Sequence, residues 1–274
     1  MQTAIAIVTL VLLALLLGHL TASRRFRTRI LGLAARLNKA PRCQDVSAAL
    51  PPLVAEYARR AGADPRRSLR VATFNQDSEI RLKRGGKFRP TVAWQAVSLG
   101  RVGFVWDARQ DIGPFPYLRV VDAYTSLAGY LEARLFGSFP MARVSGPEIS
   151  LGEAYRYLAE LPWMPDAILG NPDLEWRVTA RNIAEVRLTT PDGVARVSFR
   201  FDAGGDIVEM EAAARPVQDT KGGTTHLDWR GRFGEYKQIG PRRLPSYGEV
   251  GYVYPDGSYE AYFRGHIRDY QISG

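Results

Sequence analysis

The chain has 274 residues, of which 46% are hydrophobic and 24% are charged, with 37 Lys and Arg against 28 Asp and Glu and a formal net charge of +9. This composition is that of a globular protein and excludes the disordered, collagen-like and low-complexity classes. A single cysteine excludes an intramolecular disulfide and a zinc site built from cysteines alone.

Residues 1–23 predict a transmembrane anchor. No charged side chain precedes Arg24, and the run from Ala4 to Leu17 is interrupted only by Thr9. With the next three residues it approaches the ~20 residues needed to cross ~30 Å of hydrocarbon. A cleaved secretory signal is the alternative, because the small residues at 21–23 suit cleavage, although no basic residue precedes the apolar core.

Residues 24–50 predict a basic juxtamembrane helix and a linker. Seven basic residues and no acid lie between positions 24 and 42, and Arg24, Arg25, Arg27 and Arg29 are expected to contact membrane lipid. Because basic flanks stay on the cytoplasmic side, we expect a single-pass protein of the inner (cytoplasmic) membrane with its C-terminal domain in the cytoplasm; a periplasmic domain is the alternative. The remaining 30 basic and 28 acidic residues nearly balance, so no nucleic-acid partner is expected.

Residues 51–274 predict one antiparallel β domain. A helix is expected near 51–61, where Pro51 and Pro52 suit a first turn and Gly62 a helix end. Beyond it the apolar residues alternate with polar ones, which is typical of strands with one buried face. We expect strands near 69–82, 88–97, 102–110, 118–126, 129–144, 174–179, 182–190, 194–202, 206–214, 227–238, 247–254 and 260–271.

A helix pair is predicted near 150–169. Its first helix carries an apolar stripe at helical spacing, which is expected to pack on the sheet, and Pro162 ends that helix. Glu153, Arg156 and Glu160 take the opposite side, which favours a solvated charge ladder over an acid–base pair.

The helix pair is too small to cover the predicted sheet. Eleven or twelve strands at ~4.8 Å would span roughly 50 Å, whereas two helices of ~10 Å diameter cover less than half of that width. The sheet must therefore curl into a half-barrel around the helices, which predicts an apolar hollow. Each aromatic residue alone is better explained as core, but together they are candidates to line this hollow: Phe104, Trp106, Tyr124, Phe136, Tyr155, Trp163, Trp176, Phe199 and Phe201.

Several motifs resemble an uncharacterised bacterial family in which an N-terminal membrane segment precedes a domain of unknown function. They lie at 146–149, 152–160 and 163–165, with further matches at 50–62, 231–236 and 244–250. The arrangement also resembles the LolA/LolB-like fold of lipoprotein carriers and related lipid binders. The resemblance implies a lipid or other apolar ligand, although the lipoprotein cysteine is missing and those carriers work outside the inner membrane.

Catalytic patterns are sparse. His226 and Asp228 share a strand face and would suit a base with its orienting carboxylate, but an exposed hairpin histidine explains His226 better. Neither His266 nor the linker residue Cys43 has a catalytic partner nearby in the sequence. The histidines also lack the spacing of a metal-binding motif. We therefore expect no catalytic residue, metal or cofactor, and a non-catalytic binding protein. The alternative is an envelope interaction or scaffold module with a filled core and an unidentified protein partner.

Overall fold

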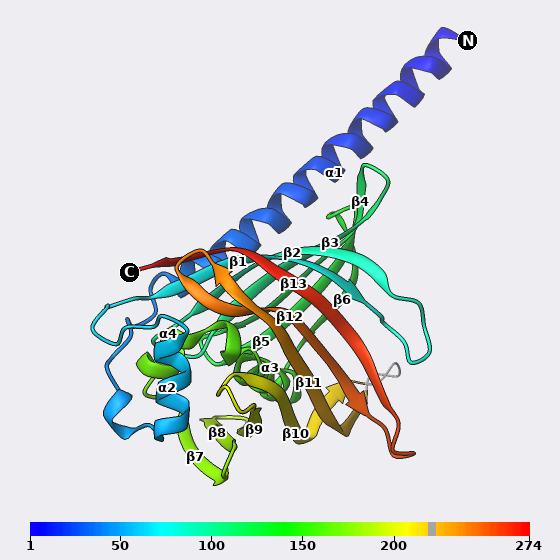
Figure 1. Cartoon of the computed structure of the whole chain (residues 1–274). Coiled ribbons are helices and arrows are strands. Elements are labelled where there is room, and N and C mark those ends of the chain that lie inside the picture. The colour runs from blue at the N-terminus through cyan, green and yellow to red at the C-terminus, as the bar shows by residue number, and fades with distance from the viewer. Residues whose placement is uncertain (219–222) are drawn as a thin grey trace.

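The computed structural model describes residues 1–218 and 223–274, and its main feature is one curved antiparallel sheet (Figure 1). Its 13 strands follow the order β6-β5-β4-β3-β2-β1-β13-β12-β11-β10-β9-β8-β7, so the first and last strands pair in the middle of the sheet. The mainly β fold class is thereby confirmed. The strands are β1 Val71–Ile80, β2 Arg89–Ser98, β3 Phe104–Ile112, β4 Phe115–Thr125, β5 Ala128–Leu135, β6 Phe139–Ser145, β7 Glu175–Ala180, β8 Ile183–Thr190, β9 Gly193–Phe201, β10 Ile207–Gln218, β11 Thr224–Ile239, β12 Arg242–Val253 and β13 Tyr259–Ser273.

One predicted strand is wrong. The stretch 129–144 forms two strands, β5 and β6, joined by a tight turn. Phe136 and Gly137 have φ values of 50° and 68° in this turn, a conformation that reverses the chain. The apolar pattern continues through Phe136 and Phe139, so it conceals the break.

A helical segment between the two edge strands lies inside the curved sheet. α3 (Pro147–Ala159), the short helix η2 (Leu161–Trp163) and α4 (Pro165–Gly170) carry the chain from edge strand β6 to edge strand β7. α3 contacts β4, β5 and β6 on one side and β8, β9 and β10 on the other, so it lies inside the curved sheet (Figure 1). α2 (Pro52–Arg60) packs on α4, and η1 (Ser47–Ala49) precedes it.

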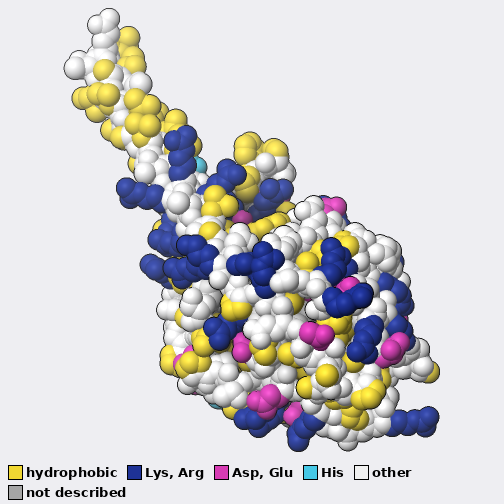
Figure 2. Space-filling model, turned by 90° about the vertical axis from the view of Figure 1, so that its left-hand side faces the viewer, with side chains coloured by type: hydrophobic (Ala, Val, Ile, Leu, Met, Phe, Trp, Pro, Cys, Tyr) yellow, Lys and Arg dark blue, Asp and Glu magenta, His cyan; other side chains and the backbone are white. Residues whose placement is uncertain are grey.

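The N-terminal helix lies on the opposite, convex face. α1 (Gln2–Leu37) is one continuous helix whose last third buries Phe26, Ile30, Leu33 and Leu37. These side chains pack on a separate apolar cluster formed by Val71, Ala96, Val105, Val121 and Ala123. The first half of α1 projects away from the domain, is unburied, and is long and apolar enough to cross a membrane (Figure 2).

A buried ion pair fixes the helical segment to the sheet. Asp166 at the start of α4 accepts two hydrogen bonds from Arg242 on β12, at 2.7 and 2.8 Å. Each side chain is only 2% exposed. This contact joins α4 to β12.

Candidate functional site

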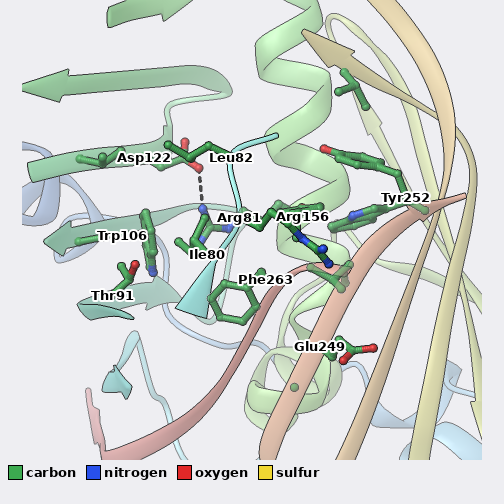
Figure 3. Close-up of a pocket in the computed structure, with 18 of the residues that line it drawn as sticks. Ile80, Arg81, Leu82, Thr91, Trp106, Asp122, Arg156, Glu249, Tyr252 and Phe263 are labelled. Carbon is green, nitrogen blue, oxygen red and sulfur yellow. Dashed lines mark hydrogen bonds and ion pairs between the residues drawn. The ribbon is translucent and has the colours of Figure 1, made fainter. Parts of the chain in front are cut away.

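A cavity lies between α3 and the concave face of the sheet. Its volume is about 510 Å³, which falls in the ~300–1,000 Å³ range of small-molecule sites. Strands β1 to β5 and β10 to β13 contribute to its wall, and its surface is mainly apolar. Figure 3 shows Trp106, Tyr252 and Phe263 around this space, which we call the hollow.

A charged cluster is built into the floor of the hollow. Arg156 on α3 pairs with Asp122 on β4 at 2.5 Å (Figure 3). It also pairs with Glu160, one helical turn later, at 2.9 Å. Its guanidinium also lies over the rings of Phe104 and Trp106, at 4.8 and 5.0 Å. Burial lowers the pKa of Arg156, but the carboxylates of Glu160 and Asp122 outweigh it and raise that pKa overall.

The solvated charge ladder predicted on α3 is therefore wrong. Glu153 and Glu160 are both buried, and Arg156 lines the hollow with them. Because the curved sheet encloses α3 from both sides, its polar face meets the interior of the protein instead of water. Buried charged groups are costly unless they are paired, so the side-chain pairing around Arg156 is a requirement of this enclosure.

Glu153 has a raised pKa. Burial and the negative charge of Asp122 raise its pKa well above 4.5, more than the charges of Arg156 and Arg215 lower it. A neutral Glu153 carboxyl can donate its proton to Asp122, whose other oxygen is engaged by Arg156. The surroundings of Glu153 thus disfavour its charged form.

A β-bulge turns Arg215 toward the interior. The register of β10 against β11 shifts between Ala212 and Arg215, and Ala214 in this bulge has a φ of 48°. Asp228 on β11 accepts a hydrogen bond from the backbone N–H of Ala214 at 3.0 Å and so stabilises the bulge. The extra residue moves Arg215 and Val217 to the wall of the hollow.

The nine aromatic residues predicted to line the hollow are divided between the cavity wall, the core and the surface. Trp106 and Trp163 line the hollow. Phe104, Tyr124, Tyr155, Phe199 and Phe201 are buried in the main core, and Trp176 packs against that core beside Phe199. Phe136 is exposed at the β5–β6 turn, on the outside of the sheet.

The polar candidates do not converge on one site. His226 is exposed, and Asp228 stabilises the bulge. His266 is exposed and lies 3.2 Å from Glu235. Cys43 is half-buried, and desolvation raises its pKa to about 12, so its thiol is a poor nucleophile. Within residues 1–218 and 223–274 no group of three His, Cys, Asp or Glu side chains suits a metal ion.

The four arginines expected to contact lipid are exposed on α1, on the C-terminal side of its apolar run. Arg29 reaches the domain and pairs with the buried carboxylate of Glu132 at 2.6 Å. Figure 2 shows basic side chains gathered where α1 meets the domain.

The residues that sequence reasoning missed are Glu153, Arg156 and Arg215. The first two had a signal, since they lie on one face of α3, but that face was assigned to solvent. Arg215 had no such signal, because the bulge that turns it inward breaks the alternation of its strand.

Three solved structures are similar to this chain at low sequence identity. A putative outer membrane lipoprotein-sorting protein domain from Vibrio parahaemolyticus is 10% identical, with a TM-score of 0.46, over 80% of this chain and 90% of that one. A LolA superfamily protein from Nitrosomonas europaea is 6% identical, with a TM-score of 0.40, over 81% and 92%. A DUF1329 family protein from Desulfovibrio piger is 10% identical, with a TM-score of 0.45, over 83% and 93%.

The comparison with curated proteins found no match. A family model matches residues 40–265, which cover the β domain except for the C-terminal part of β13. The expected membership in a family with a domain of unknown function is thus confirmed: the chain belongs to the family of unknown function DUF6544.

Proposed function

We propose that this protein binds a lipid or another amphiphile in the hollow while α1 anchors it to a membrane. The observation that carries the proposal is the hollow itself, an apolar cavity of about 510 Å³ under a curved sheet. An apolar chain that enters it leaves water, and this burial contributes ~25 cal/mol for every Å² removed from solvent. No covalent step is required.

The unfilled interior favours ligand binding over the scaffold alternative, which requires a filled core. The anchor supports the same function, because a tethered domain stays beside the membrane that supplies amphiphiles. The exposed arginines after the apolar run favour contact with lipid phosphates and a cytoplasmic domain, with a periplasmic domain as the alternative.

Filling the hollow is expected to remove the ligand. Val120 on β4 and Val250 on β12 both line the cavity and are partly buried, so the double substitution Val120→Trp, Val250→Trp occupies it with two indoles. Native mass spectrometry of the full chain released from nonionic micelles is expected to show a bound amphiphile in the wild type and at least ~10-fold less in the double variant.

The matched control is Val178→Trp, which places an indole on the exposed face of β7 outside the hollow. This variant is expected to retain the ligand. Equal loading of the wild type and the double variant, or no loading of the wild type with oleate, oleyl alcohol or lysophosphatidate, would overturn the proposal.

A further inference from the structure

Arg215 is a buried cation that lacks an ionic partner. The residue is 8% exposed and lines the hollow. Its Nη1 donates to the Tyr252 hydroxyl at 3.0 Å and its Nη2 to the backbone carbonyl of Gly152 at 3.1 Å. Its Nε has no hydrogen-bond partner, and no carboxylate in the described part of the chain forms an ion pair with it.

The neighbouring acids form no ion pair with Arg215. Asp122 is engaged by Arg156, and burial and the charge of Asp122 raise the pKa of Glu153 and so disfavour its charged form. Arg156 thus has two carboxylates and Arg215 none, although both line the same cavity. Since an uncompensated buried charge is costly, a counter-charge at Arg215 would be stabilising.

We propose that the ligand of the hollow is an anionic amphiphile whose carboxylate or phosphate pairs with Arg215 while its chain lies along the apolar wall. This inference rests on the proposed function and adds the chemical class of the head group. Trp229, whose ring lies 4.5 Å from the Arg215 guanidinium, holds that group in place from the other side. A planar guanidinium binds both oxyanions well.

The test is a competition among three ligands with similar chains. The full chain in nonionic micelles is incubated at pH 7 with oleate, oleoyl-lysophosphatidate and oleyl alcohol, and native mass spectrometry measures the ratio in which they bind. The wild type is expected to prefer at least one anion over the alcohol by ~10-fold or more, the size of a charged hydrogen bond. Preference for oleate alone indicates a carboxylate site, and preference for lysophosphatidate alone a phosphate site.

Arg215→Gln is expected to bring the anion-to-alcohol ratio close to one, while Arg215→Lys keeps part of the preference. Arg230→Gln is the matched control, because Arg230 lies on the exposed side of β11 and is paired with Glu211. The ratio within one sample is independent of the folded fraction, so a destabilised variant remains informative. If the wild type binds the alcohol as well as the anions, the role of Arg215 is overturned and lipid binding stands; if it binds none, both fail.

A second, independent observation concerns two hairpin turns beside α1. Outside α1, seven large hydrophobic side chains are exposed among the described residues, and five of them lie in the β3–β4 and β5–β6 hairpins, at or next to their turns. These five are Ile112, Phe115, Phe136, Phe139 and Met141. Figure 2 shows hydrophobic side chains on a projection next to α1, close to basic ones.

The β5–β6 turn is fastened to α1 at the end of its apolar run. The Ser138 hydroxyl and the His19 ring lie within hydrogen-bonding distance, at 2.7 Å. Further toward the C-terminus of α1, Arg134 of β5 lies over the ring of Phe26 at 4.7 Å, and Arg29 pairs with Glu132. The apolar side chains of the two hairpins and the exposed arginines of α1 therefore lie close to the part of α1 that would leave a bilayer.

We infer that these two turns dock on the bilayer, with their apolar side chains at the acyl boundary and the arginines at the phosphates. Exposed apolar patches rimmed by charge are typical of membrane contacts, which bury such side chains ~5–10 Å deep. The contact holds the domain at a fixed height and orientation beside α1, and it depends on α1 crossing the membrane.

Site-specific labelling of the full chain in nanodiscs containing anionic lipid tests this docking. With Cys43 replaced by Ala, an environment-sensitive fluorophore is attached at Phe115→Cys, Met141→Cys or, as the control, Val178→Cys on exposed β7. Blue-shifted emission and quenching by nitroxide-labelled lipid are expected at 115 and 141 but not at 178. Water-like emission at all three positions would overturn the docking, whatever ligand occupies the hollow.

Discussion

Asp166→Asn is expected to lower the free energy of unfolding by ~3–5 kcal/mol. The substitution leaves the Arg242 guanidinium buried without its carboxylate, and the asparagine side chain offers one acceptor where Arg242 now uses two. Because this pair joins α4 to β12, its loss also weakens the attachment of α4 to the sheet. Equilibrium unfolding in urea, followed by tryptophan fluorescence of the full chain in nonionic micelles, measures the change.

The control for this prediction is an exposed ion pair in the same sheet. Glu211 and Arg230 face each other on β10 and β11 at 3.1 Å, with both side chains more than half exposed. Glu211→Gln is expected to change the free energy of unfolding by no more than ~1 kcal/mol. If Asp166→Asn has an equally small effect, burial of the Arg242–Asp166 pair does not contribute to stability as argued.

Glu153→Gln is expected to make the protein more stable than the wild type at neutral pH and equally stable near pH 4. The pKa of Glu153 in the folded protein lies well above 4.5, because burial and the Asp122 carboxylate disfavour its charged form. Below 4.5 both the folded and the unfolded chain hold the proton, and the contribution of the group to stability is fully present. As pH rises above 4.5 the unfolded chain releases its proton first, so the free energy of unfolding falls by about 1.4 kcal/mol per pH unit until the folded protein also releases it.

Glutamine imitates the neutral carboxyl, and its amide can still donate to Asp122, so the variant lacks this pH-dependent loss. The other charged groups that face position 153 are Asp122, Arg156 and Arg215, and all of them remain in the variant. The measurement is urea unfolding of both proteins between pH 4 and pH 8. A difference between them that does not grow with pH would show that Glu153 is ionised in the folded protein.

The strands and the helix pair were predictable because their signals are local. Alternation of apolar and polar residues fixes which face of a strand is buried, and it located nearly all of the sheet. It failed at Phe136, where the turn depends on backbone conformation and an apolar residue occupies the tip. The unequal sizes of sheet and helices also predicted a hollow, since uncovered apolar area forces a sheet to curl.

The chemistry of the hollow was not predictable from the same patterns. The polar face of α3 has the composition of a solvated surface, and only the sheet wrapping around it makes Glu153 and Arg156 buried groups. Arg215 reaches the interior through one extra residue in β10, an event that hydrogen bonding between strands decides.

The amino-acid sequence by itself therefore determined the apolar N-terminal helix with its arginine band, the antiparallel class and the need for a cavity. All three follow from where apolar and charged residues stand along the chain. The tertiary structure decided which side chains line that cavity, how its charges pair and where the hairpin tips lie against α1. These depend on contacts between segments far apart in the chain, such as Asp122 with Arg156, Ser138 with His19 and Asp166 with Arg242.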